Sequence, residues 1–91
     1  MKPYRIEILP SAQKELLSLP KIIQKRMAGK IDLLKVHPRP QDARTLKGTR
    51  REVYRLRIGD YRVLYQIRDE ILLILVIKIG HRREVYRRMG S

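Results

Sequence analysis

The chain has 91 residues, of which 43% are hydrophobic and 34% are charged. This length and apolar content fit one small folded domain, taken here as residues 1–91, and exclude a chain that is disordered throughout. The absence of Cys excludes a disulfide scaffold, a thiolate zinc site and a cysteine nucleophile. The 22 Lys and Arg against 9 Asp and Glu give a net charge of +13, which indicates a polyanionic partner: nucleic acid first, an acidic protein second.

Membrane insertion and secretion are not expected. The longest apolar run, Ile71 to Ile79, includes Lys78 and is much shorter than the roughly 18 residues that cross a bilayer. The N-terminus has no apolar signal-peptide stretch, and the basic residues do not lie opposite a bare apolar helical face. We therefore expect a cytoplasmic protein with no membrane partner. Gly90 and Ser91 are either native or a cloning remnant.

The first half of the chain predicts a strand followed by two helices. Residues 4–8 alternate apolar and charged side chains, as a half-buried strand does, and Pro10 ends that strand. Ser11 is expected to cap a first helix, and Pro20 suits the first turn of a second. The second helix carries one apolar stripe, made of Ile23, Met27, Ile31 and Leu34. Two helices joined by a tight turn form a hairpin that must cover an apolar surface.

The segment after the second helix predicts a surface connection. His37-Pro38-Arg39-Pro40 ends the helix, because each Pro removes a backbone donor and disfavours helix in the residue before it. The stretch as far as Thr49 has few apolar residues, and Gly48 suits a turn. Basic side chains are frequent along it: Arg44, Lys47, Arg50 and Arg51. A plain solvated loop explains them equally well.

The second half predicts a β-meander. Residues 53–58 and 61–68 alternate, with Gly59-Asp60 as a two-residue hairpin turn between them. That turn sets a register in which Ile58 faces Tyr61, Arg57 faces Arg62, and Leu56 faces Val63. Asp69-Glu70 turns the chain into Ile71 to Ile79, a run apolar on both faces that indicates a central strand, and Gly80 closes it. The fold class is therefore α+β, with a helical hairpin on one face of a small, mostly antiparallel sheet in the order β-α-α-β-β-β.

This register gathers Arg55, Arg57 and Arg62 on the sheet face that the helices do not cover. Like charges directly opposite one another cost a few tenths to about 1 kcal/mol. We expect such an arrangement mainly where it serves a function, and a phosphate group would neutralise it. The alternative is an ordinary solvated sheet face, partly neutralised by Glu52 or Asp60.

The basic tail from Gly80 to Arg88 begins at the end of the sheet, near Arg62. Tyr86 offers a ring on which a base can stack and a hydroxyl for proton chemistry, although a frayed charged terminus is the alternative. The histidines His37 and His81 have no metal-ligand spacing. They can act as a paired acid and base only if the fold brings the loop and the tail together.

Three segments of the chain resemble the RelE/ParE superfamily of bacterial and archaeal toxins. They are Leu46-Lys47-Gly48, the stretch from Tyr54 to Tyr65, and the stretch from Ile79 to Tyr86. The likeness extends over nearly the whole chain, and the basic face together with Glu84-Val85-Tyr86 points to the RelE branch. It implies the toxin of a type II toxin–antitoxin system, a ribosome-dependent mRNA endonuclease that acts in the ribosomal A site and uses no metal or other cofactor. A ribose 2′-hydroxyl would attack the adjacent phosphate, leaving a 2′,3′-cyclic phosphate and a free 5′-hydroxyl.

The resemblance also implies roles for individual residues. Arg55, Arg57 and Arg62 match the family's basic strand residues; because Arg is a poor proton donor or acceptor, we assign them charge stabilisation and substrate positioning. Tyr86 matches the catalytic Tyr and is expected to be the general base, while Arg82, or Arg83 or His81 in its place, assists the leaving oxygen. Further RNA contacts are expected from Lys47, Arg50, Arg51, His81 and Arg83.

The resemblance leaves two other functions open. A ParE-like chain would poison DNA gyrase and would need neither Tyr86 nor the arginines of the sheet. A non-catalytic module would only bind antitoxin and nucleic acid. In each case the expected partner is a cognate antitoxin with an acidic or amphipathic helix that docks in an apolar groove, and operator DNA is contacted only through the antitoxin complex.

Overall fold

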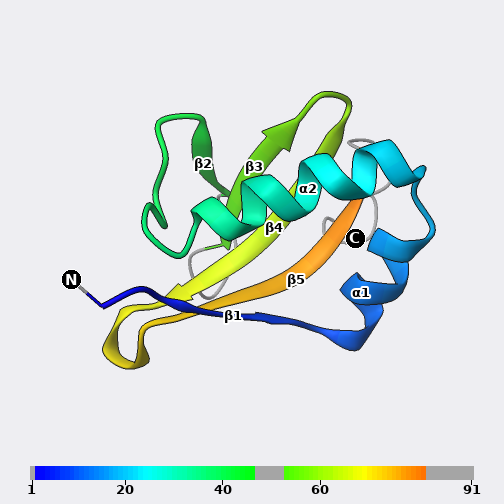
Figure 1. The fold of residues 1–91 in the computed structure, drawn as a ribbon. Helices are drawn as coiled ribbons and strands as arrows, with labels where there is room; N and C mark the ends of the chain where they lie inside the picture. The colour runs from blue at the N-terminus through cyan, green and yellow to red at the C-terminus, as the bar shows by residue number, and fades with distance from the viewer. Residues whose placement is uncertain (1, 47–52, 82–91) are drawn as a thin grey trace.

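The computed structural model describes residues 2–46 and 53–81. Its elements run β1 (Arg5–Ile8), α1 (Pro10–Leu17), α2 (Lys21–Leu33), β2 (Ala43–Leu46), β3 (Val53–Ile58), β4 (Tyr61–Arg68), η1 (Asp69–Ile71) and β5 (Leu73–His81). Within these residues the strands form one five-stranded sheet in the order β1-β5-β4-β3-β2. Strands β1 and β5 pair in parallel, the other neighbours are antiparallel, and both helices lie over one face (Figure 1). The predicted α+β fold with a helical hairpin on a mostly antiparallel sheet is confirmed.

Strand β2 was not predicted from the sequence, which indicates a surface connection between the second helix and Thr49. Ala43 pairs with Leu56 and Leu46 with Val53, so the chain order is β-α-α-β-β-β-β. The strand is short and lies at the edge of the sheet, where it needs a partner on one side only; its weak alternation therefore carried no clear signal. The turn expected at Gly48 lies outside the described residues.

The two helices begin at different residues from those expected. Pro10 is already in the first turn of α1 and Leu9 precedes it as N-cap, so Ser11 does not cap the helix. Pro is tolerated there because its missing N–H would have no partner inside the helix. Pro20 is the N-cap of α2, and its carbonyl accepts hydrogen bonds from the backbone N–H groups of Ile23 and Gln24.

The predicted hairpin register is confirmed. Arg57 pairs with Arg62, and the flanking pairs Ile58–Tyr61 and Leu56–Val63 are also as expected. Gly59 has a φ of 61°, a left-handed conformation that favours glycine, and so supports the two-residue turn. The side-chain faces of β3 and β4 therefore follow from the sequence.

The main core lies between the sheet and the helices. Helix α2 contributes Met27, Ile31 and Leu34, which pack with residues of the sheet such as Tyr65 and Val76. The opposite sheet face, called the far face from here on, carries a smaller apolar cluster in the described residues, made of Val53, Leu64, Leu46 and Ile77. Leu64 was expected on this face but is fully buried, so the far face is not uniformly open to solvent.

Strand β5 lies between β1 and β4, as an interior strand should. It starts later than predicted, because Ile71 belongs to η1 and Leu72 adopts a left-handed conformation with φ 52°. It also ends later: Gly80 does not close the strand but pairs with Arg62, and the strand continues to His81.

A bulge in β5 anchors helix α1. Leu64 pairs with Lys78 and Tyr65 with Val76, so Ile77 is the extra residue. The Glu15 carboxylate of α1 accepts a hydrogen bond from the Ile79 N–H at 3.0 Å and from Lys78 Nζ at 2.5 Å. Both side chains of this ion pair are mostly buried. Helix α1 is thus joined to the last described strand by polar contacts as well as by packing.

Candidate functional site

The described strands place an arginine cluster on the far face, made of Arg44, Arg55, Arg57 and Arg62. Arg57 lies directly opposite Arg62 across β3 and β4, as predicted. Arg44 lies directly opposite Arg55 across β2 and β3, which was not predicted because β2 itself was missed. Arginines that face each other across a sheet repel one another, so this part of the far face has a strongly positive potential.

The members of the arginine cluster differ in exposure. Arg44 and Arg57 are exposed and Arg55 is half-buried, whereas Arg62 is only 4% exposed. The sequence predicts Arg62 on an exposed sheet face. Instead its Nη1 donates to the backbone carbonyls of Gly59 at 3.3 Å and Tyr61 at 3.0 Å, so the guanidinium lies against the hairpin turn.

Arg62 has no carboxylate partner in the part of the chain that the structure describes. Its Nε is buried without a hydrogen-bond partner, and none of the ion pairs between described residues includes it. Asp60, proposed as a neutralising acid, forms no ion pair there either, and Glu52 lies outside the described residues. A buried cation without an anion is costly, and an anionic ligand would remove that cost.

Several expected site residues lie outside the described residues. They are the proposed base and leaving-group residues together with most of the expected RNA contacts: Lys47, Arg50, Arg51, Arg82, Arg83 and Tyr86. Their roles therefore stay predictions from the sequence.

His81 does not join the arginine cluster. Its ring makes an edge-on contact with Tyr61, with ring centroids 5.9 Å apart, and Tyr61 packs against the main core. His81 is thus on the helix-bearing side of the sheet. His37 is remote from it: the neighbouring Pro38 carbonyl binds Tyr65, which lies four residues from Tyr61 along β4, or roughly 13 Å. The paired-histidine acid and base is therefore not assembled.

A polar centre that the sequence did not reveal joins the 37–40 loop to the strands. Arg39 Nη2 donates to Asp69 Oδ2 at 2.8 Å, and its Nε donates to the Tyr54 hydroxyl at 3.0 Å. The Tyr4 hydroxyl donates to Asp69 Oδ1 at 2.6 Å. The hydrogen bonds from Arg39 and then Tyr4 hold the pKa of Asp69 below its usual value. No short-range pattern could have shown these contacts, because they join residues far apart in the chain.

Tyr65 extends this polar centre into the core. It is fully buried, stacks on Tyr54 with ring centroids 5.6 Å apart, and donates its hydroxyl to the Pro38 carbonyl at 2.8 Å. Burial raises the pKa of Tyr65, so the hydroxyl stays protonated. These contacts fix the loop in place, which is a structural role.

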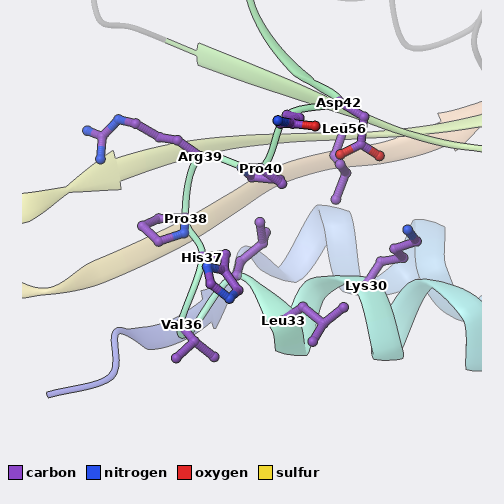
Figure 2. A pocket seen from close by; sticks show the side chains of 11 residues that line it. Lys30, Leu33, Val36, His37, Pro38, Arg39, Pro40, Asp42 and Leu56 are labelled. Carbon is purple, nitrogen blue, oxygen red and sulfur yellow. The ribbon is translucent and has the colours of Figure 1, made fainter. Parts of the chain in front are cut away.

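A groove of about 590 Å³ lies on the helix-bearing side, between α2 and the loop that follows it. Figure 2 shows Leu33 and Val36 beside His37 and Pro38, with Lys30 and Asp42 further along. None of the arginines of the cluster lines this groove, and neither does a Ser, Thr or Tyr hydroxyl among the described residues. The groove and the arginine cluster are therefore separate features on opposite sides of the sheet.

No helix among residues 2–46 and 53–81 is long and apolar enough to cross a membrane. Nor do three or more His, Asp or Glu side chains gather there in a way that could hold a metal ion.

Comparison with known proteins identifies the family. Residues 6–86 match the model of the ParE toxin of the type II toxin–antitoxin system parDE. The chain is 36% identical over 87 residues to a putative toxin RelE1 of Methanocaldococcus jannaschii, covering 92% of this chain and 96% of that protein. It is 30% identical over 89 residues to toxin RelG of Mycobacterium tuberculosis, covering 94% and 99%.

A solved structure agrees with these relatives. The archaeal RelE–RelB complex from Pyrococcus horikoshii superposes with a TM-score of 0.78 at 36% identity, covering 88% of this chain and 96% of the matched one. The family model, the relatives and the mixed sheet under its helical hairpin thus agree: the chain belongs to the RelE/ParE family of type II toxin–antitoxin toxins.

Proposed function

We propose that this toxin is an endoribonuclease that cleaves messenger RNA in the A site of the ribosome and so stops translation. The arginine cluster is the observation that carries the proposal. Its exposed member Arg57 and its buried member Arg62 face each other, and Arg62 has no carboxylate partner in the described residues. A scissile phosphate bound over this pair would supply the missing negative charge.

The proposed reaction is attack of a ribose 2′-hydroxyl on the adjacent phosphate. It forms the new 2′-oxygen–phosphorus bond as the 5′-oxygen leaves, and it gives a 2′,3′-cyclic phosphate and a 5′-hydroxyl. The 2′-hydroxyl loses a proton, the phosphorane gains negative charge, and the leaving oxygen takes up a proton. No metal or other cofactor is proposed. The protein has to supply a base, positive charge and an acid.

The arginines divide the electrostatic work. Arg57 is exposed and can donate two parallel hydrogen bonds to phosphate oxygens. Arg62 is buried beside it, where its charge is screened less than on an open surface. We therefore assign direct contact to Arg57, with Arg55 beside it on β3, and assign to Arg62 stabilisation of the charge that develops on the phosphorane.

We assign proton transfer to the basic tail, Gly80 to Arg88, on the basis of the family resemblance. Tyr86 is the proposed general base, because neighbouring cations favour its phenolate. Arg82 is the proposed partner of the leaving oxygen, with Arg83 as its substitute. His81 is a weaker candidate, since its ring lies against Tyr61 on the other side of the sheet from the arginine cluster.

The proposed protein partner is a cognate antitoxin. The archaeal relative was solved as a RelE–RelB complex, and the net charge of +13 favours an acidic or amphipathic antitoxin segment. Operator DNA would be contacted only through that complex. Ribosome and mRNA as targets place the proposed site of action in the cytoplasm.

The test is primer extension on an mRNA in a purified translation system, with the native chain, Arg57→Ala and Tyr86→Phe. We expect ribosome-dependent cleavage by the native chain and a loss of at least about 100-fold in each variant. Arg26→Ala removes an equal charge from an exposed position on α2 and should cleave normally. Absence of cleavage by the native chain, with translation unaffected, would contradict the proposal.

DNA gyrase inhibition is the second candidate, because the matching family model is that of the ParE toxin. A supercoiling assay beside the translation assay separates the two. Inhibition of supercoiling by the native chain and by Tyr86→Phe alike, without RNA cleavage, would identify the gyrase-directed function. Inactivity in both assays would favour the third function, a non-catalytic module that only binds antitoxin and nucleic acid.

A further inference from the structure

We infer that Arg44 is a further RNA contact, which binds the phosphate of the nucleotide next to the one held at Arg57. The inference rests on the proposed function and makes it more specific. It states that the arginine cluster holds at least two consecutive phosphates of one RNA strand. Arg44 lies in the stretch after the second helix for which the sequence predicts a surface connection. In the structure this stretch forms strand β2, so Arg44 is part of the sheet.

The spacing of the arginine cluster supports two phosphate positions. Arg44 and Arg55 form one directly opposed pair, and Arg57 and Arg62 form the other. Arg55 and Arg57 are two residues apart on β3, which is roughly 6.6 Å along the strand, and their partners lie on opposite sides of β3, so the midpoints of the two pairs are also offset by about 4.8 Å across the sheet. An RNA strand that runs obliquely over β3 can place one phosphate at each pair, because the long arginine side chains reach over the remaining distance.

The Arg44 side chain is suited to a ligand. It is exposed, and its Nη1 donates to the carbonyl oxygens of Gln41 at 2.8 Å and Ala43 at 3.3 Å. These bonds orient the guanidinium without neutralising it, because both acceptors are backbone carbonyls. No ion pair between described residues includes Arg44. The Nη2 edge of the fork remains available for phosphate oxygens.

A different role for Arg44 follows from its place on an edge strand. Charged side chains on edge strands discourage pairing between molecules. That role would make Arg44→Ala more prone to self-association but would leave its affinity for RNA unchanged. The edge-strand role does not require Arg44 to lie opposite Arg55, whereas phosphate binding by the pair does. The two roles therefore differ in what they predict for RNA.

The experiment measures binding of the full-length chain to a fluorescent, 2′-deoxy-substituted single strand by anisotropy across a series of salt concentrations. Arg44→Ala should weaken binding and reduce the slope of log affinity against log salt by about 0.7, the value for one phosphate contact on a single strand. Arg44→Lys should restore the slope. Arg26→Ala, which removes an equal charge from the helix side, should leave it near the native value.

Strand length sharpens the test. The effect of Arg44→Ala should be present on a trinucleotide with two internal phosphates and absent on a dinucleotide with one. An equal slope for Arg44→Ala and Arg26→Ala, or no binding by the native chain, would overturn the inference. If the two-phosphate effect is found while the translation assay shows no cleavage, the proposed nuclease fails and the RNA contact stands.

Discussion

Arg39 and Arg62 show how differently one residue type is used at two ends of the same sheet. In the polar centre, Arg39 binds the Asp69 carboxylate with two nitrogens, donates to the Tyr54 hydroxyl and lies over that ring. In the arginine cluster, Arg62 donates hydrogen bonds only to backbone carbonyls of the described residues, and its neighbour on β3 is another arginine, Arg57. Arg39 has its counter-ion within the fold, whereas Arg62 has none among residues 2–46 and 53–81.

On the proposed function, this difference separates a structural arginine, Arg39, from one that serves ligand binding, Arg62. A cation whose hydrogen-bond donors are occupied by protein groups has no donors left for a ligand, and its bonds help to hold its loop in place. A cation that is buried beside a second cation lowers stability until an anion arrives.

The sharpest test exchanges each arginine for an apolar residue of similar length. Arg62→Met should reduce RNA cleavage by at least about 100-fold and leave the free energy of unfolding within about 1 kcal/mol of native, because the substitution removes a buried charge that has no anion among the described residues. Arg39→Met should leave cleavage by the folded protein intact and lower stability by about 1 kcal/mol through the lost bond to Tyr54. Chemical denaturation and primer extension on both variants give the two readouts. The reverse pattern would refute the distinction.

A second test concerns a partnered ion pair elsewhere in the fold. Glu15→Gln leaves Lys78 without its carboxylate in a mostly buried position, and it should lower stability by about 2 kcal/mol. Glu7→Gln removes a carboxylate from an exposed pair with Arg5 and should change stability by less than about 0.5 kcal/mol. Urea denaturation measures both. Similar losses in the two variants would show that burial does not set the strength of these pairs.

Alkaline pH should act through Tyr65. Its pKa is raised in the folded chain, so the protonated hydroxyl contributes stability below the unfolded pKa of about 10. That contribution is lost as the pH rises through the folded pKa. Tyr65→Phe should be about 1 kcal/mol less stable than native at neutral pH, because the Pro38 carbonyl loses its donor, and the gap should narrow above about pH 10. A constant gap across thermal melts at increasing pH would count against this account.

Acid pH should have the smallest effect, through Asp69. Its pKa is lowered by Arg39 and Tyr4, so its contribution is complete above the unfolded pKa of about 3.9 and disappears as the pH falls through the folded pKa. Asp69→Asn should therefore melt below native at neutral pH and converge with it in acid. Asp32→Asn, in an exposed pair with Lys35, serves as the control. Parallel melting curves for native and Asp69→Asn down to pH 2 would contradict the assignment.

The faces of the hairpin were predictable because a two-residue turn and strict alternation are local features. Gly59 marked the turn, and from it followed the opposition of Arg57 and Arg62. The burial of Arg62 was not predictable, since it depends on how a long side chain packs. Strand β2 was not predicted because a short edge strand needs little apolar patterning. The pairing of Arg44 with Arg55 could therefore not be predicted either. The polar centre joins Tyr4 to Asp69 and Arg39, a contact that no local pattern encodes.

The parallel pairing of β1 with β5 affects how the protein is made. Arg5 to Ile8 pair with Leu73 to Val76, far apart in the chain, so the sheet cannot be completed until β5 has left the ribosome. Contacts between such distant segments slow folding, because a long loop must close first. During synthesis β1 therefore has no strand to join until β5 has been made, although β1 itself is made earlier. The order of the strands thus makes the pairing of β1 a late step in folding.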